Sequence, residues 1–365
     1  MTSLYVHVPF CPTICPYCDF HAVRRTRGAV AAYLERLEAE ARALAPTRTP
    51  LRTLYYGGGT PSYLREDELV RLLSLGLPLE AGAEVTLEAN PGTLNRSRLA
   101  LLRSLGVNRL SIGVQSFQDP VLRGLGRAHR ARGAYRAIEE ALDAGFRVSI
   151  DLILGLPGQD PERDLKEAVR LGVGHVSAYT LIVEPGTPFA LAGLRENPDR
   201  EARAFALAEA ILGEAGLVRY EVANFARPGE EARHNQVYWR MGFWAGLGPS
   251  AASHEPAGAP GLYAVRRTRP PLHRWLAGEP PAEEPIPPRE HVREALMMGL
   301  RTREGVDVAG LEAATGLKLW ERLRPAAERL AEAGLLEVGK GRLVPTAGGL
   351  DLVHSLVLPL WEALS

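Results

Sequence analysis

The sequence predicts an α/β protein, in which a parallel (β/α)6 partial barrel precedes a small winged-helix-like C-terminal domain. Apolar strand-like runs alternate six times with helical segments. Glycine-rich and polar motifs follow these runs, at the places where the loops of parallel barrels carry chemistry. Beyond a proline-rich stretch, three helical segments and a hairpin follow in an order that resembles a winged helix.

The expected strands are β-branched or continuously apolar, as strands buried on both faces are. They are Leu4–Val8, Thr53–Tyr56, Glu84–Glu88, Arg109–Val114, Arg147–Ile153 and His175–Ile182. The helices expected between and after them have apolar residues at helical spacing. They lie near Ala29–Leu44, Glu66–Leu75, Asn95–Leu105, Ala134–Ala144, Pro161–Leu171 and Arg200–Ala215.

Unusual motifs stand where five of the expected strands end. The first strand ends at a group of cysteines, and the others end in Gly57-Gly58-Gly59-Thr60-Pro61, Glu88-Ala89-Asn90-Pro91, Gln115-Ser116 and Gly155-Leu156-Pro157-Gly158. Because the carboxyl ends of parallel strands share one rim of a barrel, we expect these motifs to meet there.

The three cysteines of the chain, Cys11, Cys15 and Cys18, lie within eight residues. An odd, tight group suits a metal site in a reducing compartment better than a disulfide framework. A structural zinc site closes with four ligands, and His7 or His21 could complete one. A [4Fe–4S] cube has four irons, so three thiolates leave one iron open for the amino and carboxylate groups of a small molecule. The C-x3-C-x2-C spacing favours the cluster, and iron with acid-labile sulfide would distinguish it from zinc.

Other polar and glycine residues near this rim are candidates for binding a ligand. The glycine run lets the backbone approach a ligand closely, although a simple strand-to-helix turn would also need glycine. Glu88, Gln115, Arg127 and Asp151 could bind a ribose, an amine or a carboxylate, or could be solvated loop residues or helix caps. Tyr17, between two of the cysteines, could pack on an adenine ring or in the core.

Composition and charge exclude some classes of function. The 43 basic and 43 acidic side chains cancel, and no basic stripe marks a nucleic-acid-binding face. The first ten residues read as a strand and not as a signal peptide, and no apolar run is long enough to span a bilayer. We therefore expect a cytoplasmic protein that does not bind nucleic acid.

The motifs together resemble the HemN/HemW group of the radical-SAM superfamily, and the similarity runs over nearly the whole chain. The segments that carry it are YVHVPFC (5–11), CPYCDF (15–20), YGGGTP (56–61), EANP (88–91), GVQS (113–116) and DLILGLP (151–157). The resemblance implies a [4Fe–4S] cluster on the three cysteines and bound S-adenosylmethionine (SAM). The positions that match the group's SAM contacts are Tyr5, Tyr17, Gly58, Gly59, Thr60, Glu88, Gln115, Arg127 and Asp151.

The group contains two kinds of protein: the oxygen-independent coproporphyrinogen III dehydrogenase, which oxidatively decarboxylates two propionate side chains, and haem chaperones. The dehydrogenase pattern has a fourth cysteine two residues after the third, where this sequence has Phe20. The dehydrogenase also has a longer segment before its cluster. Residues 234–239 (HNQVYW) match the HNxxYW signature of the chaperones. These features favour a chaperone, with the dehydrogenase or another radical-SAM reaction as the alternative.

In a chaperone of this kind, His234 is the candidate axial ligand of haem iron, because a neutral imidazole binds it well. Tyr238 and Trp239 could cover a porphyrin face, and Asn235 could orient the imidazole ring. Without the resemblance, His234 would be read as a hydrogen-bonded histidine in an aromatic-rich loop. The sequence has no Cys-x-x-Cys-His motif, which excludes c-type haem attachment.

We expect three parts in the chain: the barrel (1–225), the HNxxYW segment with an extended proline-rich connection (226–288) and the winged-helix-like domain (289–365). Acidic residues mix with basic ones in the last part, so a lid that faces protein or substrate is favoured over DNA binding. The expected partners are haem as cargo, recipient apo-haemoproteins and a reductant or electron donor. Membrane-associated recipients and a homodimer are further expectations.

Overall fold

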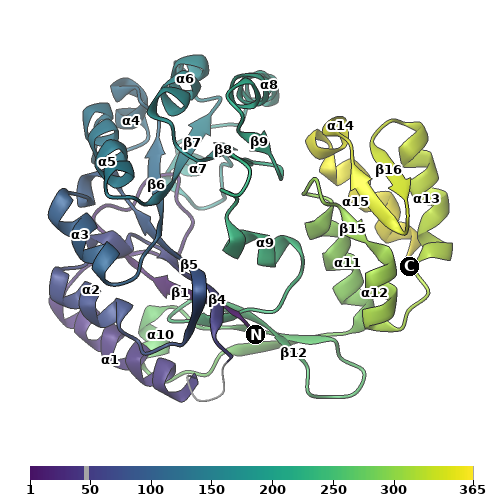
Figure 1. The fold of residues 1–365 in the computed structure, drawn as a ribbon, viewed down its shortest axis with the longest axis horizontal. Coiled ribbons are helices and arrows are strands. Elements are labelled where there is room, and N and C mark those ends of the chain that lie inside the picture. Colours follow the sequence, from purple (N-terminus) through teal and green to yellow (C-terminus); the bar gives the residue numbers. More distant parts are fainter. Residues whose placement is uncertain (45–48, 365) are drawn as a thin grey trace.

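The computed structural model describes residues 1–44 and 49–364, and it contains the predicted parallel barrel (Figure 1). The six expected strands are present and pair in parallel in chain order. They are β1 (Ser3–Val8), β4 (Leu51–Gly58), β5 (Leu79–Ala89), β6 (Arg109–Gln115), β7 (Arg147–Leu154) and β8 (His175–Thr180). Each expected helix is also present. They are α1 (Arg27–Leu44), α2 (Glu66–Leu73), α3 (Arg96–Ser104), α5 (Ala131–Asp143), α6 (Pro161–Leu171) and α8 (Pro198–Glu214).

Three short strands that the sequence did not reveal extend this sheet at both edges. β11 (Ala245–Leu247) adds in parallel beside β1, and β10 (Asn224–Ala226) adds antiparallel beside β8, followed by β9 (Val218–Arg219). The nine strands form one row from β11 to β9. Strands of two or three residues are too short to show a period of two in the sequence, and only pairing with distant partners defines them.

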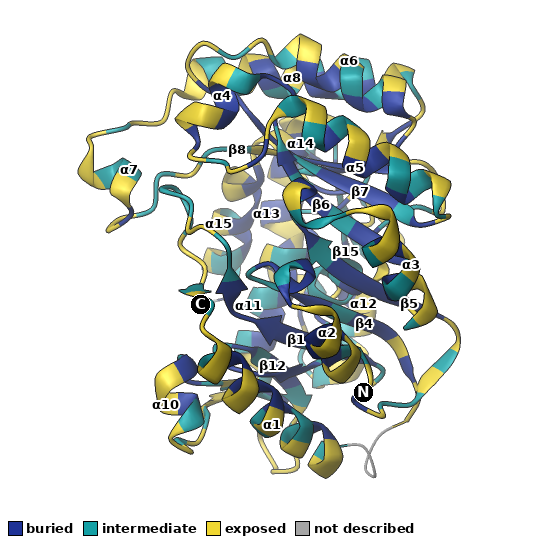
Figure 2. Ribbon diagram, turned by 90° about the vertical axis from the view of Figure 1, so that its left-hand side faces the viewer, coloured by how far each residue is buried: buried dark blue, intermediate teal, exposed yellow. Residues whose placement is uncertain are grey.

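Local chemistry explains where the barrel helices begin and end. Helix α3 begins after Asn95, whose side chain accepts a hydrogen bond from the Arg98 amide at 2.9 Å. Asp160 caps α6 in the same way, and Gly172 ends it with φ at 73°. Solvent-facing residues lie on the outer faces of these helices, while the strands inside them are buried (Figure 2).

The proline-rich connection, expected to be extended over 257–288, is folded, which corrects that expectation. It forms an antiparallel sheet of β12 (Ala252–Pro256), β13 (Ala264–Thr268) and β14 (Ala282–Ile286), with helix α10 (Leu272–Leu276) before β14. Arg266 and Arg267 of β13 pair with Glu284 and Glu283 directly opposite on β14, at 3.0 and 2.7 Å. Such cross-strand pairs stabilise a sheet that contains little apolar sequence.

Helix α10 attaches this segment to the barrel core. Trp275 is 1% exposed, its ring lies 5.8 Å from that of Tyr33, and its Nε1 donates to Glu40 Oε1 at 2.8 Å. The guanidinium of Arg36 lies 5.0 Å from the centre of the indole ring. Three residues of α1 therefore hold one side chain that lies more than two hundred positions away in the sequence.

The C-terminal unit, residues 288–364, has a core of its own and the expected winged-helix-like order. Its elements are α11 (Pro288–Gly299), β15 (Val306–Asp307), α12 (Val308–Thr315), α13 (Trp320–Glu332), β16 (Leu336–Gly339), β17 (Arg342–Pro345), α14 (Ala347–Asp351) and α15 (Val353–Ala363). Lys340 and Gly341 both have positive φ, which is typical of a two-residue hairpin turn between strands that twist to the right. Among the helices described, none is both long and apolar enough to cross a membrane.

We expect Trp275→Ala to lower the free energy of unfolding by about 3–5 kcal/mol, as truncation of a buried aromatic side chain does. Urea unfolding followed by circular dichroism would measure the change. Leu358, which is 57% exposed, provides the control, because Leu358→Ala should change stability by less than about 0.5 kcal/mol. Equal losses in the two variants would contradict the anchoring role of Trp275.

Candidate functional site

The cysteine loop starts at the carboxyl end of β1, at one rim of the barrel. Strand β2 (Phe10–Cys11) pairs with β3 (Val23–Arg24), so the two ends of the loop are held side by side. Inside the loop, the Cys18 amide donates to the Cys15 carbonyl at 3.1 Å and closes a turn. All three thiols are partly exposed. The loop therefore presents them together at the rim, as the sequence predicts.

The glycine run holds this loop from the neighbouring strand. The Gly59 amide donates to the Val8 carbonyl at 2.9 Å, and the Thr60 amide donates to the Phe10 carbonyl at 2.8 Å. A Cβ on Gly59 would lie 2.6 Å from the Val8 oxygen, and one on Gly58 would lie 2.3 Å from the His7 ring. The close approach that requires glycine here is therefore to the end of β1 and to Phe10, which lead into the cysteine loop. The Thr60 Oγ1 lies 3.5 Å from the Cys11 Sγ.

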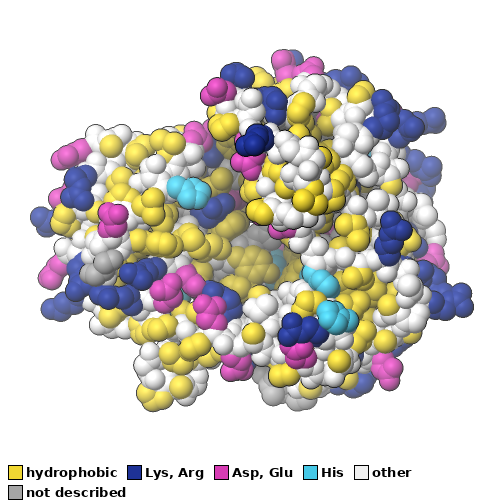
Figure 3. Space-filling view, turned by 180° about the vertical axis from the view of Figure 1, so that it is seen from behind, with side chains coloured by type: hydrophobic (Ala, Val, Ile, Leu, Met, Phe, Trp, Pro, Cys, Tyr) yellow, Lys and Arg dark blue, Asp and Glu magenta, His cyan; other side chains and the backbone are white. Residues whose placement is uncertain are grey.

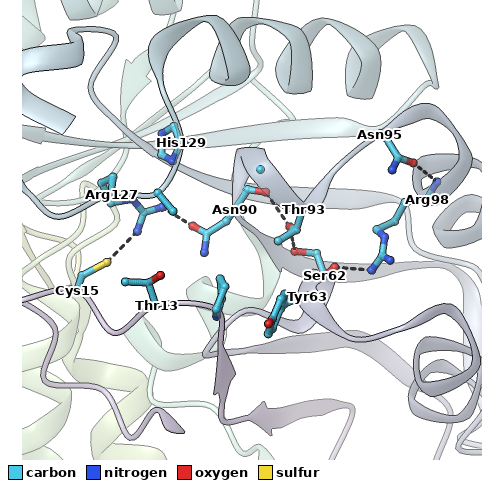
Figure 4. A pocket seen from close by; sticks show the side chains of 13 residues that line it. Thr13, Cys15, Ser62, Tyr63, Asn90, Thr93, Asn95, Arg98, Arg127 and His129 are labelled. Atoms are coloured by element: carbon cyan, nitrogen blue, oxygen red, sulfur yellow. Dashed lines mark hydrogen bonds between the residues drawn. The ribbon is translucent and has the colours of Figure 1, made fainter. Parts of the chain in front are cut away.

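Arg127 connects the cysteine loop to two other strand ends. Its Nη1 lies 3.4 Å from both the Cys15 Sγ and the Tyr17 hydroxyl, and its Nη2 donates to the Gly113 carbonyl at 2.7 Å and to the Asn90 side chain. Figure 4 shows Arg127 lying between Cys15 and Asn90. A cation in this place stabilises thiolates through electrostatic attraction.

The strand ends surround a cavity of about 530 Å³. This volume lies within the range of small-molecule and cofactor sites. Most of the predicted site residues line it: Cys11, Cys15, Cys18, Tyr17, Gly58, Gly59, Thr60, Glu88, Gln115, Arg127 and Asp151. Seen from behind, the molecule is hollowed between its C-terminal unit and the barrel, and hydrophobic side chains gather on the floor of the hollow (Figure 3).

Two carboxyl groups lie deep in this cavity. Burial raises the pKa of Glu88 to about 7, although the Tyr55 hydroxyl and the Gly58 amide donate to it at 2.7 and 2.9 Å. Burial likewise raises the pKa of Asp151 to about 6, and Ser111 donates to it at 3.4 Å. A cationic or hydroxyl-bearing ligand would stabilise both carboxylates.

Gln115 enters the cavity from a strained position. Its φ is 67°, a left-handed value that residues other than glycine rarely adopt, and the β6–β7 register shifts between Ile112 and Gln115. Backbone strain of this kind concentrates at functional sites. The irregular end of β6 thus turns the Gln115 amide toward the cavity.

A second cavity of about 460 Å³ borders the cysteine loop and shares lining residues with the main cavity (Figure 4). Cys15, Asn90 and Arg127 line both cavities and so form part of the wall between them. Beyond them, Arg98 donates to the Ser62 carbonyl at 2.6 Å. In the sequence, Asn90 stands out only as part of the EANP motif, yet in the structure it donates to Thr60 at 2.8 Å and accepts from Arg127.

Tyr5 and His234 do not line the main cavity. The Tyr5 hydroxyl shares a 3.0 Å hydrogen bond with His7 Nδ1, and its ring lies 6.0 Å from that of Tyr55. His234 is 1% exposed; its Nδ1 shares a 2.9 Å hydrogen bond with Thr53, and its Nε2 shares one of 2.7 Å with Tyr238. Burial lowers the pKa of His234 to about 3. The role of His234 as an axial ligand of haem iron stays a prediction. Binding of iron would require the ring to lose its hydrogen bond to Thr53 or to Tyr238.

The HNxxYW segment instead forms a helix, α9 (Arg233–Trp239), that packs against the barrel. The carboxylate of Glu84 accepts from the Arg233 and His234 amides, at 3.2 and 2.9 Å, and so caps the helix. The Tyr55 ring stacks on His234 at 5.2 Å. Only Asn235, the second residue of the motif, reaches the main cavity.

The three thiols are the donor set that a [4Fe–4S] cluster with one open iron requires. The histidines that could complete a zinc site have other partners. His7 Nε2 bonds the His21 carbonyl at 3.0 Å, and His21 Nε2 accepts from the Leu272 amide at 3.1 Å.

Comparisons with known proteins agree with this geometry. The radical SAM superfamily pattern matches residues 5–172, and the HemN C-terminal domain matches 286–352. The chain is 38% identical to the "Heme chaperone HemW" of Lactococcus lactis over 327 residues, which cover 85% of this chain and 84% of that protein. It is 37% identical to the "Heme chaperone HemW" of Mycobacterium tuberculosis over 98% of this chain and 94% of that protein.

A solved structure shares the fold. The "Coproporphyrinogen III oxidase (HemN)" of Escherichia coli, described as a radical SAM enzyme, superimposes with a TM-score of 0.82 and 25% identity, covering 98% of this chain and 89% of that one. The open parallel barrel with three cysteines at the end of its first strand thus defines a radical-SAM protein. Within that class, the chain belongs to the HemW family.

We expect Gly59→Ala to reduce cluster assembly strongly, because its Cβ would collide with the backbone that leads to Cys11. The measurement is iron and acid-labile sulfide per chain after anaerobic reconstitution. Gly92→Ala is the control, since a Cβ there meets no atom within 4 Å among the residues described. Normal iron content in Gly59→Ala would show that the glycine run does not position the loop.

We expect the stability of Glu88→Gln, relative to the wild type, to rise with pH between about 4.5 and 7. In the folded wild type, the Glu88 carboxyl keeps its proton up to about pH 7, whereas in the unfolded chain it releases the proton near pH 4.5. Ionisation of Glu88 between these pH values therefore favours the unfolded chain. The neutral amide has no such dependence. Urea midpoints across the window test this, with Glu80→Gln on the same strand as control. A constant difference would contradict a raised pKa.

Proposed function

We propose that this chain is a haem chaperone that binds haem and transfers it to apo-haemoproteins, and that carries a [4Fe–4S] cluster and SAM. The observation that carries the proposal is the match to several HemW proteins at 34–38% identity, which extends over 84–96% of their length for three of them. The HemN enzyme, in contrast, matches over a similar length with only 25% identity. The fold is common to both kinds of protein, so sequence is what separates them.

The residue at position 20 supports the same choice. Phe20 stands where the dehydrogenase pattern has its fourth cysteine, and it is 68% exposed beside the cysteine loop. A flat apolar side chain at the mouth of the cavity suits contact with a porphyrin better than coordination of a metal.

The cofactors would be held by residues that line the main cavity. Cys11, Cys15 and Cys18 would bind three irons and leave the fourth for the amino and carboxylate groups of SAM. The cluster supplies electrons to SAM in radical-SAM chemistry when both are bound. Glu88 and Asp151 are placed to accept hydrogen bonds from the amine or ribose of SAM.

We expect anaerobically reconstituted protein to take up haem in a stoichiometric amount and to form no protoporphyrinogen from coproporphyrinogen III. Haem titration followed by absorbance measures the first quantity. Chromatography of porphyrins after incubation with SAM and a reductant measures the second. Repeated turnover to protoporphyrinogen would reject the chaperone in favour of the dehydrogenase, and a protein that bound neither compound would reject both.

A further inference from the structure

The interior of the barrel is polar, which is uncommon for a parallel barrel. Branched apolar side chains usually fill such an interior. Here alternate residues of β5, β6, β7 and β8 line the main cavity, and most of them are polar. The apolar residues between them belong to the buried core outside the cavity. The polar pairs that matter below are Thr86 and Glu88 of β5, Arg109 and Ser111 of β6, and Ser149 and Asp151 of β7.

These side chains lie at two depths along the strands. Glu88 lies opposite Ser111, whereas Thr86 lies opposite Arg109, two residues nearer the start of each strand. Two residues of a strand span about 7 Å, so the second pair lies about 7 Å further from the rim, measured along the strands. We call Thr86 and Arg109 the lower layer.

The lower layer has polar atoms without partners, and the layer above it does not depend on any outside group. Glu88 accepts two hydrogen bonds, and Ser111 donates to Asp151 at 3.4 Å. In contrast, the Thr86 hydroxyl and the Arg109 Nη2 are buried and have no hydrogen-bond partner among the residues described. Both residues are 1% exposed. Because buried polar groups are almost always bonded, these two donors indicate an acceptor from outside the chain.

Arg109 also lacks a close anionic partner. Its Nη1 donates to the Glu230 carbonyl at 3.0 Å, and its ion pair with Glu84 is 3.9 Å long, which exceeds a hydrogen bond. Arg147 lies closer to the same Glu84 oxygen, at 3.6 Å, and pairs with the Glu230 carboxylate at 2.8 Å. Burial lowers the pKa of Arg109, because desolvation disfavours its charged form. An anion beside Nη2 would offset this desolvation.

The chemistry of the lower layer favours a carboxylate. A guanidinium N–H and a hydroxyl on neighbouring strands can each donate to one of its two oxygens. Glu88 and Asp151 line the same cavity, so a dianionic phosphate would meet more repulsion than a monoanion. Arg109 and Gln115 are the two ends of β6, a strand of 7 residues that spans about 20 Å. A propionate of a haem held at the rim would therefore not reach the lower layer.

We propose that the lower layer binds the carboxylate of a small organic acid that enters through the main cavity. The Arg109 Nη2 and the Thr86 hydroxyl are its donors. The site is separate from the cluster thiols at the rim and from the two carboxyl groups assigned to SAM. The ligand is distinct from haem, and its binding does not depend on the proposed chaperone function.

The test uses the full-length protein, reconstituted anaerobically, and trifluoroacetate as a probe followed by fluorine nuclear magnetic resonance. We expect saturable broadening of the probe signal, which acetate reverses. Thr86→Val keeps the shape of the side chain and should weaken binding by at least about tenfold, as loss of a hydrogen bond to a charged group does. Thr180→Val, at the rim end of β8 in the same cavity, is the matched control and should bind normally.

Stability distinguishes ligand binding from a purely structural role of Thr86. Because its hydroxyl has no partner among the residues described, Thr86→Val should be at least as stable as the wild type without ligand. Acetate should raise the urea midpoint of the wild type and of Thr180→Val, since a ligand of the folded state stabilises it, but not that of Thr86→Val. A loss of stability in ligand-free Thr86→Val would show that the hydroxyl is already bonded within the chain and would overturn the inference.

The other outcomes also decide the inference. The carboxylate site is overturned by absence of saturable probe binding to cluster-loaded wild type, by equal affinity in Thr86→Val, or by phosphate displacing the probe at lower concentration than acetate. Haem uptake should be the same in Thr86→Val and in the wild type. Its loss in the variant would assign the carboxylate to haem and reject a free acid. Haem uptake by the wild type alone decides the chaperone proposal, whatever the probe shows.

Discussion

The parallel pairing of β1 with β4 is the constraint on which the candidate site depends. Val8 lies opposite Gly58. Backbone hydrogen bonds continue past the ends of the strands, from the Gly59 amide to the Val8 carbonyl and from the Thr60 amide to the Phe10 carbonyl. These bonds leave no room for side chains at the glycines. The position of Cys11 is therefore set by main-chain hydrogen bonds, which do not depend on the side chains of the cysteine loop.

Charge is distributed unevenly around the thiols. Burial raises the pKa of Cys11 and of Cys18, so neither thiol favours the ionised form without a cation. Arg127 supplies one positive charge beside Cys15, while Glu88 and Asp151 lie deeper in the cavity with raised pKa values. Iron would provide the remaining positive charge and deprotonate the thiols. The cavity thus favours a cationic metal centre at its rim and a ligand with an amine or hydroxyls at its base.

The sequence predicted the barrel because each strand and helix has its own pattern, and parallel pairing brings strand ends to one rim whatever the loops do. It could not predict the β12–β14 sheet. Arg266 and Arg267 stabilise that sheet only by pairing with Glu284 and Glu283, which lie opposite them on the next strand and well apart from them in the sequence. His234 lies in a recognisable motif, yet tertiary packing gives both its nitrogens partners.

HemN and this chain share a fold, but an enzyme and a chaperone require different things of it. An enzyme must hold its substrate beside the reacting cofactor, which confines the substrate to the mouth of the barrel. A chaperone only needs to bind and release its cargo, so its cargo site is free to lie elsewhere.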